Sequence, residues 1–176
     1  MRRVLYLSII ALLITGCRQK PKNPNANISF AEAQELLIRI NRTLSKEDSL
    51  KIEDYIVRAG LKDMHMSQTG LYYHISGDGD GPLVQPDDMV FYTYTISLLD
   101  STVCYRSAPN QLQSFRVGRG GVEAGLEEGI RLMREGQQAR FILPPHLAHG
   151  LVGDGKKIPA RAIIVYDIDL VRVDRQ

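Results

Sequence analysis

Few side chains in this chain have the types and spacing that metal or covalent chemistry requires. His146 and His149 are close in sequence, but no cysteine partners them and Asp154 is the nearest candidate carboxylate, so we predict no metal site. Cys104 has no His-centred pattern around it, which is typical of a small buried apolar side chain. The stretch "VGRGGVEAG" lacks the strand–GxGxxG–helix order and a P-loop lysine, so its glycines are interpreted as turn residues. We therefore expect no cofactor.

The composition is that of a globular protein without a nucleic-acid partner. The 176 residues are enough for one ordinary domain and additional segments. The formal net charge is +2, and Arg2 and Arg3 account for it if the N-terminus is removed. A mature charge near zero argues against nucleic-acid binding, which would require a basic face.

The N-terminus has the organisation of an export signal. Arg2 and Arg3 precede an apolar run, Val4–Ile14, which is shorter than the roughly 20 residues that a bilayer span needs. The run ends in "ITGC", which resembles a bacterial lipobox with Cys17 as the lipidated residue. We therefore predict a lipoprotein signal peptide over residues 1–16. The alternative is an ordinary secretory signal with a chance cysteine.

Residues 17–28 are predicted to be a flexible tether. The stretch "RQKPKNPNAN" is polar and proline-containing, so it cannot bury apolar surface. Acyl chains on Cys17 would hold the protein at a membrane without a spanning helix. We expect a lipid-anchored protein of the cell envelope that faces the periplasm. Lipidation would leave Cys104 without a partner, so no disulfide is expected.

A helical segment is predicted over residues 29–63. Ser29 followed by Glu32 is a capping box, and apolar residues then recur at helical spacing. Ser45 and Asp48 provide a second helix-start signal. The pattern predicts two helices, which form a hairpin or pack one after the other on the main domain.

From residue 64 the pattern changes to strands and turns. The predicted strands are Gly70–Ser76, Met89–Asp100, Gln137–Leu143 and Ala162–Val173. In the second and fourth of these, apolar side chains alternate with polar ones, as in a half-buried antiparallel strand.

One short helix interrupts the strands. A single apolar stripe is formed by Val122, Leu126, Ile130 and Met133. Gly136 then follows at the position of a C-terminal cap. Antiparallel strands with one helix over one face predict an α+β domain over residues 64–176.

The order and spacing of several motifs resemble one known family. These motifs are "YTYTISLLD", "FRVGRGGVEAGLEEGIRLMREGQQARFILPP", "LAHG", "KIP" and "AIIVYDIDLV". Between Gly70 and Val173 the chain looks like an FKBP-type peptidyl-prolyl cis-trans isomerase domain. The lipobox, the helical segment and "TGLYYHI" resemble the gliding-motility-associated isomerase lipoproteins within that family.

The resemblance implies a fold and a site. An antiparallel sheet of five or six strands would curl around the helix Gly125–Met133, with a shallow apolar pocket between sheet and helix. The loop from His149 to Ile158 would form one wall of that pocket. The site residues carried over from the family are Tyr94, Cys104, Tyr105, Phe115, Val122, Glu123, Leu126, His149, Ile158 and Tyr166.

The resemblance also implies a role for each part of the pocket. Tyr94 and Tyr166 would wall the proline ring, and Leu126 would form the floor. The backbone N–H of Glu123 would bind a substrate carbonyl, and His149 would offer a donor at the rim.

This chain departs from the family at four places. The family usually has Trp at Leu126, Phe-Asp at Cys104 and Tyr105, Tyr at His149 and Phe at Tyr166. The pocket carboxylate is thereby lost, and the Tyr105 hydroxyl is the candidate replacement partner of Tyr94. With Leu126 as its floor, the predicted pocket has more volume than with Trp and lacks an aromatic face at this position.

Two functions follow from the resemblance. The first is an isomerase that speeds rotation of Xaa-Pro bonds in folding envelope proteins by removing water and steadying the twisted amide. The second is a non-catalytic chaperone or assembly factor that binds partners through the same pocket or the helical segment. Proline-containing polypeptides are the expected partners. A monomer is expected, although the helical segment could mediate dimerisation.

Overall fold

The structure is a computed structural model that describes residues 29–175. The predicted signal peptide over residues 1–16, the lipidation site Cys17 and the tether 17–28 lie outside the described residues. The described residues fall into two units, which divide between Ile40 and Asn41. Within residues 29–175, no helix is both long enough and apolar enough to cross a membrane.

The helical segment is one continuous helix, α2, which spans Phe30–Arg58. Its capping box is confirmed, because the Ser29 N–H donates to Glu32 at 2.8 Å and the Glu32 N–H donates to Ser29 Oγ at 3.3 Å. The prediction of two helices was wrong. No glycine or proline interrupts the sequence from Phe30 to Arg58, so no residue there ends the helix. Ser45 and Asp48 favour the start of a helix but do not require one.

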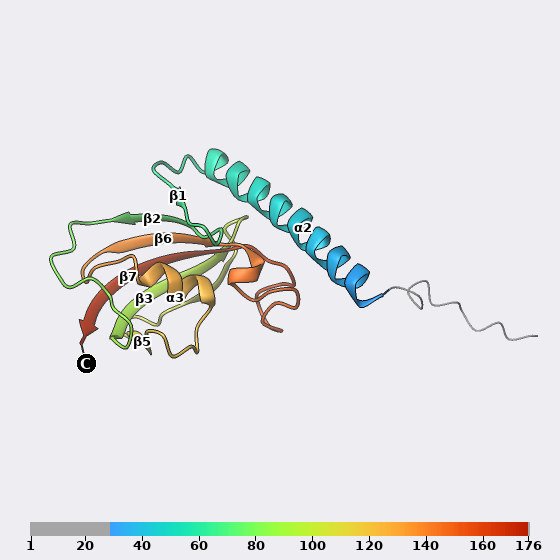
Figure 1. The fold of residues 1–176 in the computed structure, drawn as a ribbon. Coiled ribbons are helices and arrows are strands. Elements are labelled where there is room, and N and C mark those ends of the chain that lie inside the picture. Colours follow the sequence, from blue (N-terminus) through green and yellow to red (C-terminus); the bar gives the residue numbers. More distant parts are fainter. Residues whose placement is uncertain (1–28, 176) are drawn as a thin grey trace, which may run out of the picture. The chain divides into compact units, whose positions relative to one another are not determined.

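The second unit contains a seven-stranded antiparallel sheet, which curls around the short helix α3 (Figure 1). The strands are β1 (His65–Met66), β2 (Tyr72–Ser76), β3 (Met89–Leu98), β4 (Val103–Arg106), β5 (Gln113–Arg116), β6 (Gln138–Leu143) and β7 (Ile164–Asp174). Their order is β1-β2-β6-β7-β3-β4, and β5 pairs with β3. The α+β fold is therefore confirmed.

The four predicted strands correspond to β2, β3, β6 and β7. The short strands β1, β4 and β5 are not among the predicted ones. They bring the sheet to seven strands, where the resemblance implied five or six. Elements of two to four residues carry too little periodicity to be recognised, and pairing with a longer neighbour defines them.

The helix α3 spans Ala124–Ile130 and is shorter than predicted. After it, the N–H of Leu132 bonds to Gly129 O and the N–H of Met133 bonds to Ile130 O, so the chain leaves the helix through tighter turns. Gly136 does not cap this helix; its φ of 86° serves the turn before β6. Leu126, Ile130 and Met133 of the predicted apolar stripe are nevertheless buried, and Val122 is partly buried.

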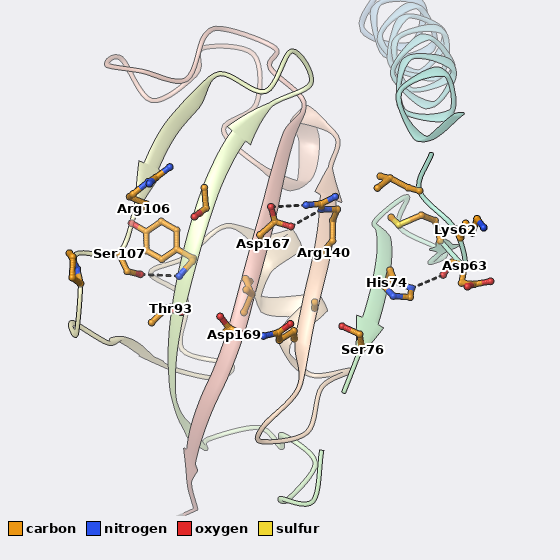
Figure 2. A pocket seen from close by; sticks show the side chains of 18 of the residues that line it. Lys62, Asp63, His74, Ser76, Thr93, Arg106, Ser107, Arg140, Asp167 and Asp169 are labelled. Atoms are coloured by element: carbon orange, nitrogen blue, oxygen red, sulfur yellow. Dashed lines mark hydrogen bonds and ion pairs between the residues drawn. The ribbon is translucent and has the colours of Figure 1, made fainter. Parts of the chain in front are cut away.

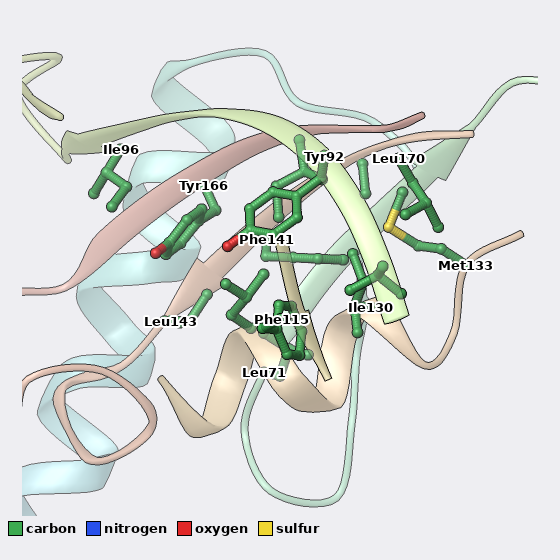
Figure 3. Packing of buried hydrophobic residues seen from close by; sticks show 14 of the residues in the cluster. Leu71, Tyr92, Ile96, Phe115, Ile130, Met133, Phe141, Leu143, Tyr166 and Leu170 are labelled. Carbon is green, nitrogen blue, oxygen red and sulfur yellow. The ribbon is translucent and has the colours of Figure 1, made fainter. Parts of the chain in front are cut away.

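Two apolar cores lie on the two faces of the sheet. The larger one fills the space between the strands and α3, where Figure 3 shows Tyr92, Phe141 and Ile130 packed together. Gly129 permits this approach, because a Cβ at that position would lie 2.7 Å from the Phe141 ring. The smaller core contains Ile52 of α2 together with Tyr72, Ile142, Ile163 and Val165.

A short 3-10 helix, η1 (Pro145–Leu147), follows β6 and leads into the loop that ends before β7. This loop contains the predicted wall from His149 to Ile158. The candidate site is thus positioned by the long central strands β3 and β7, by the short strands β4 and β5, by the start of α3 and by one loop.

Candidate functional site

The candidate site begins with an aromatic pair on neighbouring strands. Tyr94 lies on β3 and Tyr166 on β7, and these strands pair in a register that sets Ile96 opposite Tyr166. The two rings have centroids 5.8 Å apart and planes tilted by 48°, which is a favourable aromatic arrangement. Tyr166 is 4% exposed while Tyr94 is half-buried, so one ring is fixed in the core and the other remains accessible.

Phe115 is connected to this pair through Tyr92, which is not among the ten predicted site residues. Tyr92 packs edge-to-face on Phe115 with centroids 5.8 Å apart, and it lies 6.0 Å from the Tyr94 ring. Tyr92 and Tyr94 are two positions apart on β3, so their side chains lie on the same face of the strand. The pattern in β3 could therefore have indicated Tyr92.

The apolar floor and wall residues lie in the same core cluster as the aromatic rings. Leu126 is 1% exposed on α3, Ile158 is 2% exposed on the loop, and Val122 packs partly buried against the cluster. Cys104 is 3% exposed, and burial raises the pKa of its thiol, so the group stays protonated and behaves as an apolar side chain.

The carboxylate of Glu123 lies inside this arrangement. Glu123 precedes α3 in an extended conformation, and its side chain does not cap the helix. It accepts a hydrogen bond of 2.9 Å from the Tyr166 hydroxyl, and its other oxygen lies 3.0 Å from His149 Nε2. The Glu123 side chain is only 15% exposed. One carboxylate therefore connects β7, the start of α3 and the loop.

Burial and this carboxylate keep the nearby phenols protonated. Burial raises the pKa of Tyr166, and the negative charge of Glu123 raises it further. Burial, with a smaller contribution from Glu123, raises the pKa of Tyr92 to about 12. Both hydroxyls are therefore hydrogen-bond donors across the physiological pH range.

A second carboxylate organises the loop. Asp154 accepts a hydrogen bond from the Tyr105 hydroxyl, and its Oδ1 accepts from the N–H groups of Lys156 and Ile158 at 2.8 Å each. The bond from Tyr105 is the main cause that lowers the pKa of Asp154 to about 2, and the two N–H donors add to it. Asp154 is therefore ionised at neutral pH.

The expectation that the site has no carboxylate is corrected by these contacts. The Tyr105 hydroxyl donates to Asp154 and not to Tyr94, while Glu123 supplies a carboxylate from the opposite side. Glu123 was predicted only for its backbone N–H, and Asp154 only as an isolated metal-ligand candidate. Tyr166 and His149, the partners of Glu123, and Tyr105, the side-chain partner of Asp154, come from distant strands and loops, so neighbouring residues in the sequence carried no signal for these bonds.

Comparison with known proteins places this geometry in a family. A family model described as FKBP-type peptidyl-prolyl cis-trans isomerase matches residues 81–171, which is more than half of the chain. The chain belongs to this family. The matched range contains all ten predicted site residues, from Tyr94 to Tyr166. The gliding-motility subgroup remains a prediction.

FKBP-type relatives resemble the chain over different lengths. A protein named probable FKBP-type peptidyl-prolyl cis-trans isomerase FkpA from Neisseria meningitidis serogroup B is 31% identical over 144 residues, covering 81% of this chain and 52% of that protein. FK506-binding protein 2 from Candida glabrata is 38% identical over 92 residues, covering 51% of this chain and 68% of that protein. This chain spans about half the length of the FkpA-type relatives that it matches.

The fold resembles a solved FKBP-type structure as well. The crystal structure of FkpA from Escherichia coli matches with a TM-score of 0.63 and 25% sequence identity. The match covers 84% of this chain and 74% of that chain.

A separate hollow lies on the opposite face of the FKBP-type sheet (Figure 2). Its volume is about 860 Å³, and of the predicted site residues it is bordered only by Tyr94. Its floor is polar, and Arg140 holds Asp167 through bonds of 2.6 and 3.0 Å. The aromatic rings, Leu126 and Ile158 lie on the other face of the sheet, in the larger apolar core.

Proposed function

We propose that this chain catalyses cis–trans rotation about Xaa-Pro bonds of polypeptides. The observation that carries the proposal is the Tyr94–Tyr166 ring pair, which lies in one cluster with Leu126 and Ile158 inside an FKBP-type domain. No metal or covalent intermediate is needed, because the reaction only rotates an amide bond.

The mechanism acts on a barrier of about 18–20 kcal/mol, which reflects the resonance of the planar amide. The twisted amide has less charge separation than the planar one, so an apolar surrounding that excludes water favours it. Tyr94 and Tyr166 would pack on the proline ring, with Leu126 beneath it. Each tenfold gain in rate requires about 1.4 kcal/mol of preferential binding to the twisted form.

The substrate carbonyl is assigned to the backbone N–H of Glu123. The first N–H groups of a helix have no partner within the helix, and Glu123 lies immediately before Ala124 of α3. The Tyr166 hydroxyl and His149 Nε2 are already bound by the Glu123 carboxylate, so they are positioned as part of the wall.

The test is exchange spectroscopy by NMR on a short Leu-Pro peptide, with the full chain in mild detergent. We expect acceleration by the wild type and loss of acceleration in Tyr94→Ala/Tyr166→Ala. The matched variant Tyr94→Phe/Tyr166→Phe keeps both rings and is expected to remain active. Exchange at the spontaneous rate with a folded wild-type chain would refute the proposal.

One observation supports a second candidate, a non-catalytic binding module. The Glu123 carboxylate lies 3.0 Å from the Nε2 atom of His149, the residue that the resemblance assigned as a donor at the rim. A pocket with fewer available donors can still bind a proline-containing segment through its apolar wall. Peptide binding, seen as chemical-shift changes without acceleration of exchange, would favour this function.

We also propose that the protein is a lipid-anchored, periplasm-facing monomer related to the gliding-motility isomerases. The support is the "ITGC" motif at Cys17 and the "TGLYYHI" stretch. Replacement Cys17→Ser should move the protein from the membrane fraction to the soluble fraction. Sedimentation of that soluble form should give the mass of one chain. Retention at the membrane would contradict the lipid anchor.

A further inference from the structure

The second half of α2 packs against the domain that carries the candidate site. Ile52 is 0% exposed and belongs to a core cluster with Ile163 and Val165, at the start of β7. Tyr166 of the pocket wall follows directly after Val165. These helix residues lie outside the range 81–171 that the family model matches.

Asp48, one helical turn before Ile52, is buried and makes an ion pair with Arg161, whose side chain is partly exposed. Asp48 is 5% exposed, and Arg161 Nη2 lies 3.1 Å from its Oδ1 and 3.3 Å from its Oδ2. The two residues are 113 positions apart in the sequence. A carboxylate is rarely buried unless it is paired, so Arg161 accounts for the position of Asp48.

Arg161 also closes the base of the loop from Gly150 to Arg161, which contains most of the predicted wall and is called the wall loop below. Its backbone N–H donates to Gly150 O at 3.1 Å, and the N–H of Gly150 donates to Pro145 O at 2.8 Å. Arg161 has a φ of 56°, a conformation that non-glycine residues adopt only when their surroundings hold them in it. The ion pair and the backbone bond fix this residue from both ends.

The loop between Gly150 and Arg161 transmits that position to the pocket. The N–H of Asp154 donates to Ile158 O at 3.1 Å, and Asp154 Oδ1 accepts the N–H of Ile158 at 2.8 Å. The loop is therefore internally bonded and closed at its base, as in a compact surface loop whose ends lie close together. This continuous set of bonds joins Arg161 at the base to Ile158 in the predicted wall.

We propose that Asp48 is a positioning residue of the isomerase site, which acts through Arg161 on the wall loop. The second half of α2 is then part of the working isomerase unit and not only a connection to it. This inference rests on the proposed function for its catalytic consequence. Its structural consequence, the placement of the loop, can be measured without any activity.

The test compares Asp48→Asn with Asp54→Asn in the full chain. Asp54 lies on the same helix in an exposed ion pair, 2.7 Å from Arg58, so it is a matched control. In Asp48→Asn we expect shifted amide resonances and faster hydrogen exchange from Gly150 to Arg161. We also expect kcat/KM to fall about fivefold or more, mainly through KM, because a displaced wall weakens substrate binding. The control should match the wild type in both measurements.

Two further variants separate positioning from loss of stability. Ile52→Ala loosens the packing of α2 without touching the ion pair, and it should leave the loop amides and KM nearly unchanged. If Asp48→Asn does not fold, the double variant Asp48→Asn/Arg161→Gln removes both charges and leaves no unpaired buried charge. We expect the same loop changes in that variant.

The outcomes distinguish this inference from the proposed function. In Asp48→Asn, loop hydrogen-exchange rates and a KM that stay within twofold of the Asp54→Asn control would overturn the positioning role. Loop changes of equal size in Ile52→Ala would overturn it as well. A wild-type chain without isomerase activity would refute the proposed function. The amide measurements would still decide whether Asp48 positions the loop.

Discussion

The hydroxyl of Tyr166 donates a 2.9 Å hydrogen bond to the carboxylate of Glu123, across the space between β7 and the start of α3. The other oxygen of this carboxylate lies 3.0 Å from His149 Nε2. The partly buried carboxylate of Glu123 is therefore bonded on both of its oxygens at the edge of the apolar cluster. This contact orients three residues that the sequence places far apart.

Replacement Tyr166→Phe should distinguish the contribution of the hydroxyl from that of the aromatic ring. The ring and its contact with Tyr94 remain, so isomerase activity is expected to stay within about threefold of wild type, or less than 1 kcal/mol. Loss of the donor to Glu123 should lower the free energy of unfolding by about 1–2 kcal/mol. Urea unfolding and NMR exchange measure the two effects. A tenfold fall in rate would show that the hydroxyl itself takes part in catalysis.

Replacement Gly153→Ala should disrupt the wall loop. Gly153 has a φ of 72°, and a Cβ there would lie 2.3 Å from Ile158 O. Gly155 has a φ of 70° with nothing within 4 Å, so Gly155→Ala is a matched control for backbone strain alone. The control should cost about 1–2 kcal/mol of unfolding free energy, and Gly153→Ala clearly more. Equal losses in thermal or urea unfolding would contradict the predicted clash.

Replacement Leu126→Ala should destabilise the protein through a cavity. Leu126 is 1% exposed, so its truncation is expected to lower the free energy of unfolding by about 2–5 kcal/mol. Leu151 is 68% exposed, and Leu151→Ala should change it by less than about 0.5 kcal/mol. Urea unfolding of both variants tests this. A small loss at Leu126 would mean that the floor is not packed.

Replacement Tyr105→Phe should raise the pKa of Asp154. The bond from Tyr105 is the main cause that lowers this pKa from an ordinary value of 3.8 to about 2. A carboxyl whose folded pKa is depressed stabilises the fold above its unfolded pKa, and this contribution is lost as the pH falls from 3.8 toward 2. The variant should therefore lose less stability over that window.

Carboxyl NMR titration of Asp154 and unfolding as a function of pH measure these effects. The pKa should stay below its ordinary value in Tyr105→Phe, because the N–H groups of Lys156 and Ile158 still donate to Asp154. An unchanged pKa would show that the Tyr105 bond contributes little.

Local sequence patterns were sufficient for the main elements of the domain. Alternation in β3 and β7 reflects a sheet with one face on the larger core, and the stripe that includes Leu126 and Ile130 reflects the helix packed on that face. The motif order also led to the family and to the ten candidate residues. The alternation and the stripe depend on residues that are close in the sequence, where periodicity is directly visible. The family and the ten candidate residues instead come from the resemblance of the motifs to a known family.

Contacts between distant segments required the tertiary structure. Ser45 and Asp48 have the types of a helix start, yet α2 continues through them and Asp48 pairs with Arg161. The Glu123 carboxylate faces Tyr166 because strand register and helix position together set that distance.

Residue patterns along the chain were thus enough to predict the α+β domain and the positions of its four longer strands, and the ten site residues remain predictions from the family resemblance. The bonds of Glu123 and Asp154, and the ion pair between Asp48 of α2 and Arg161, became visible only in the folded chain. Side-chain type limits what a residue can bond, whereas packing sets which partner comes within reach.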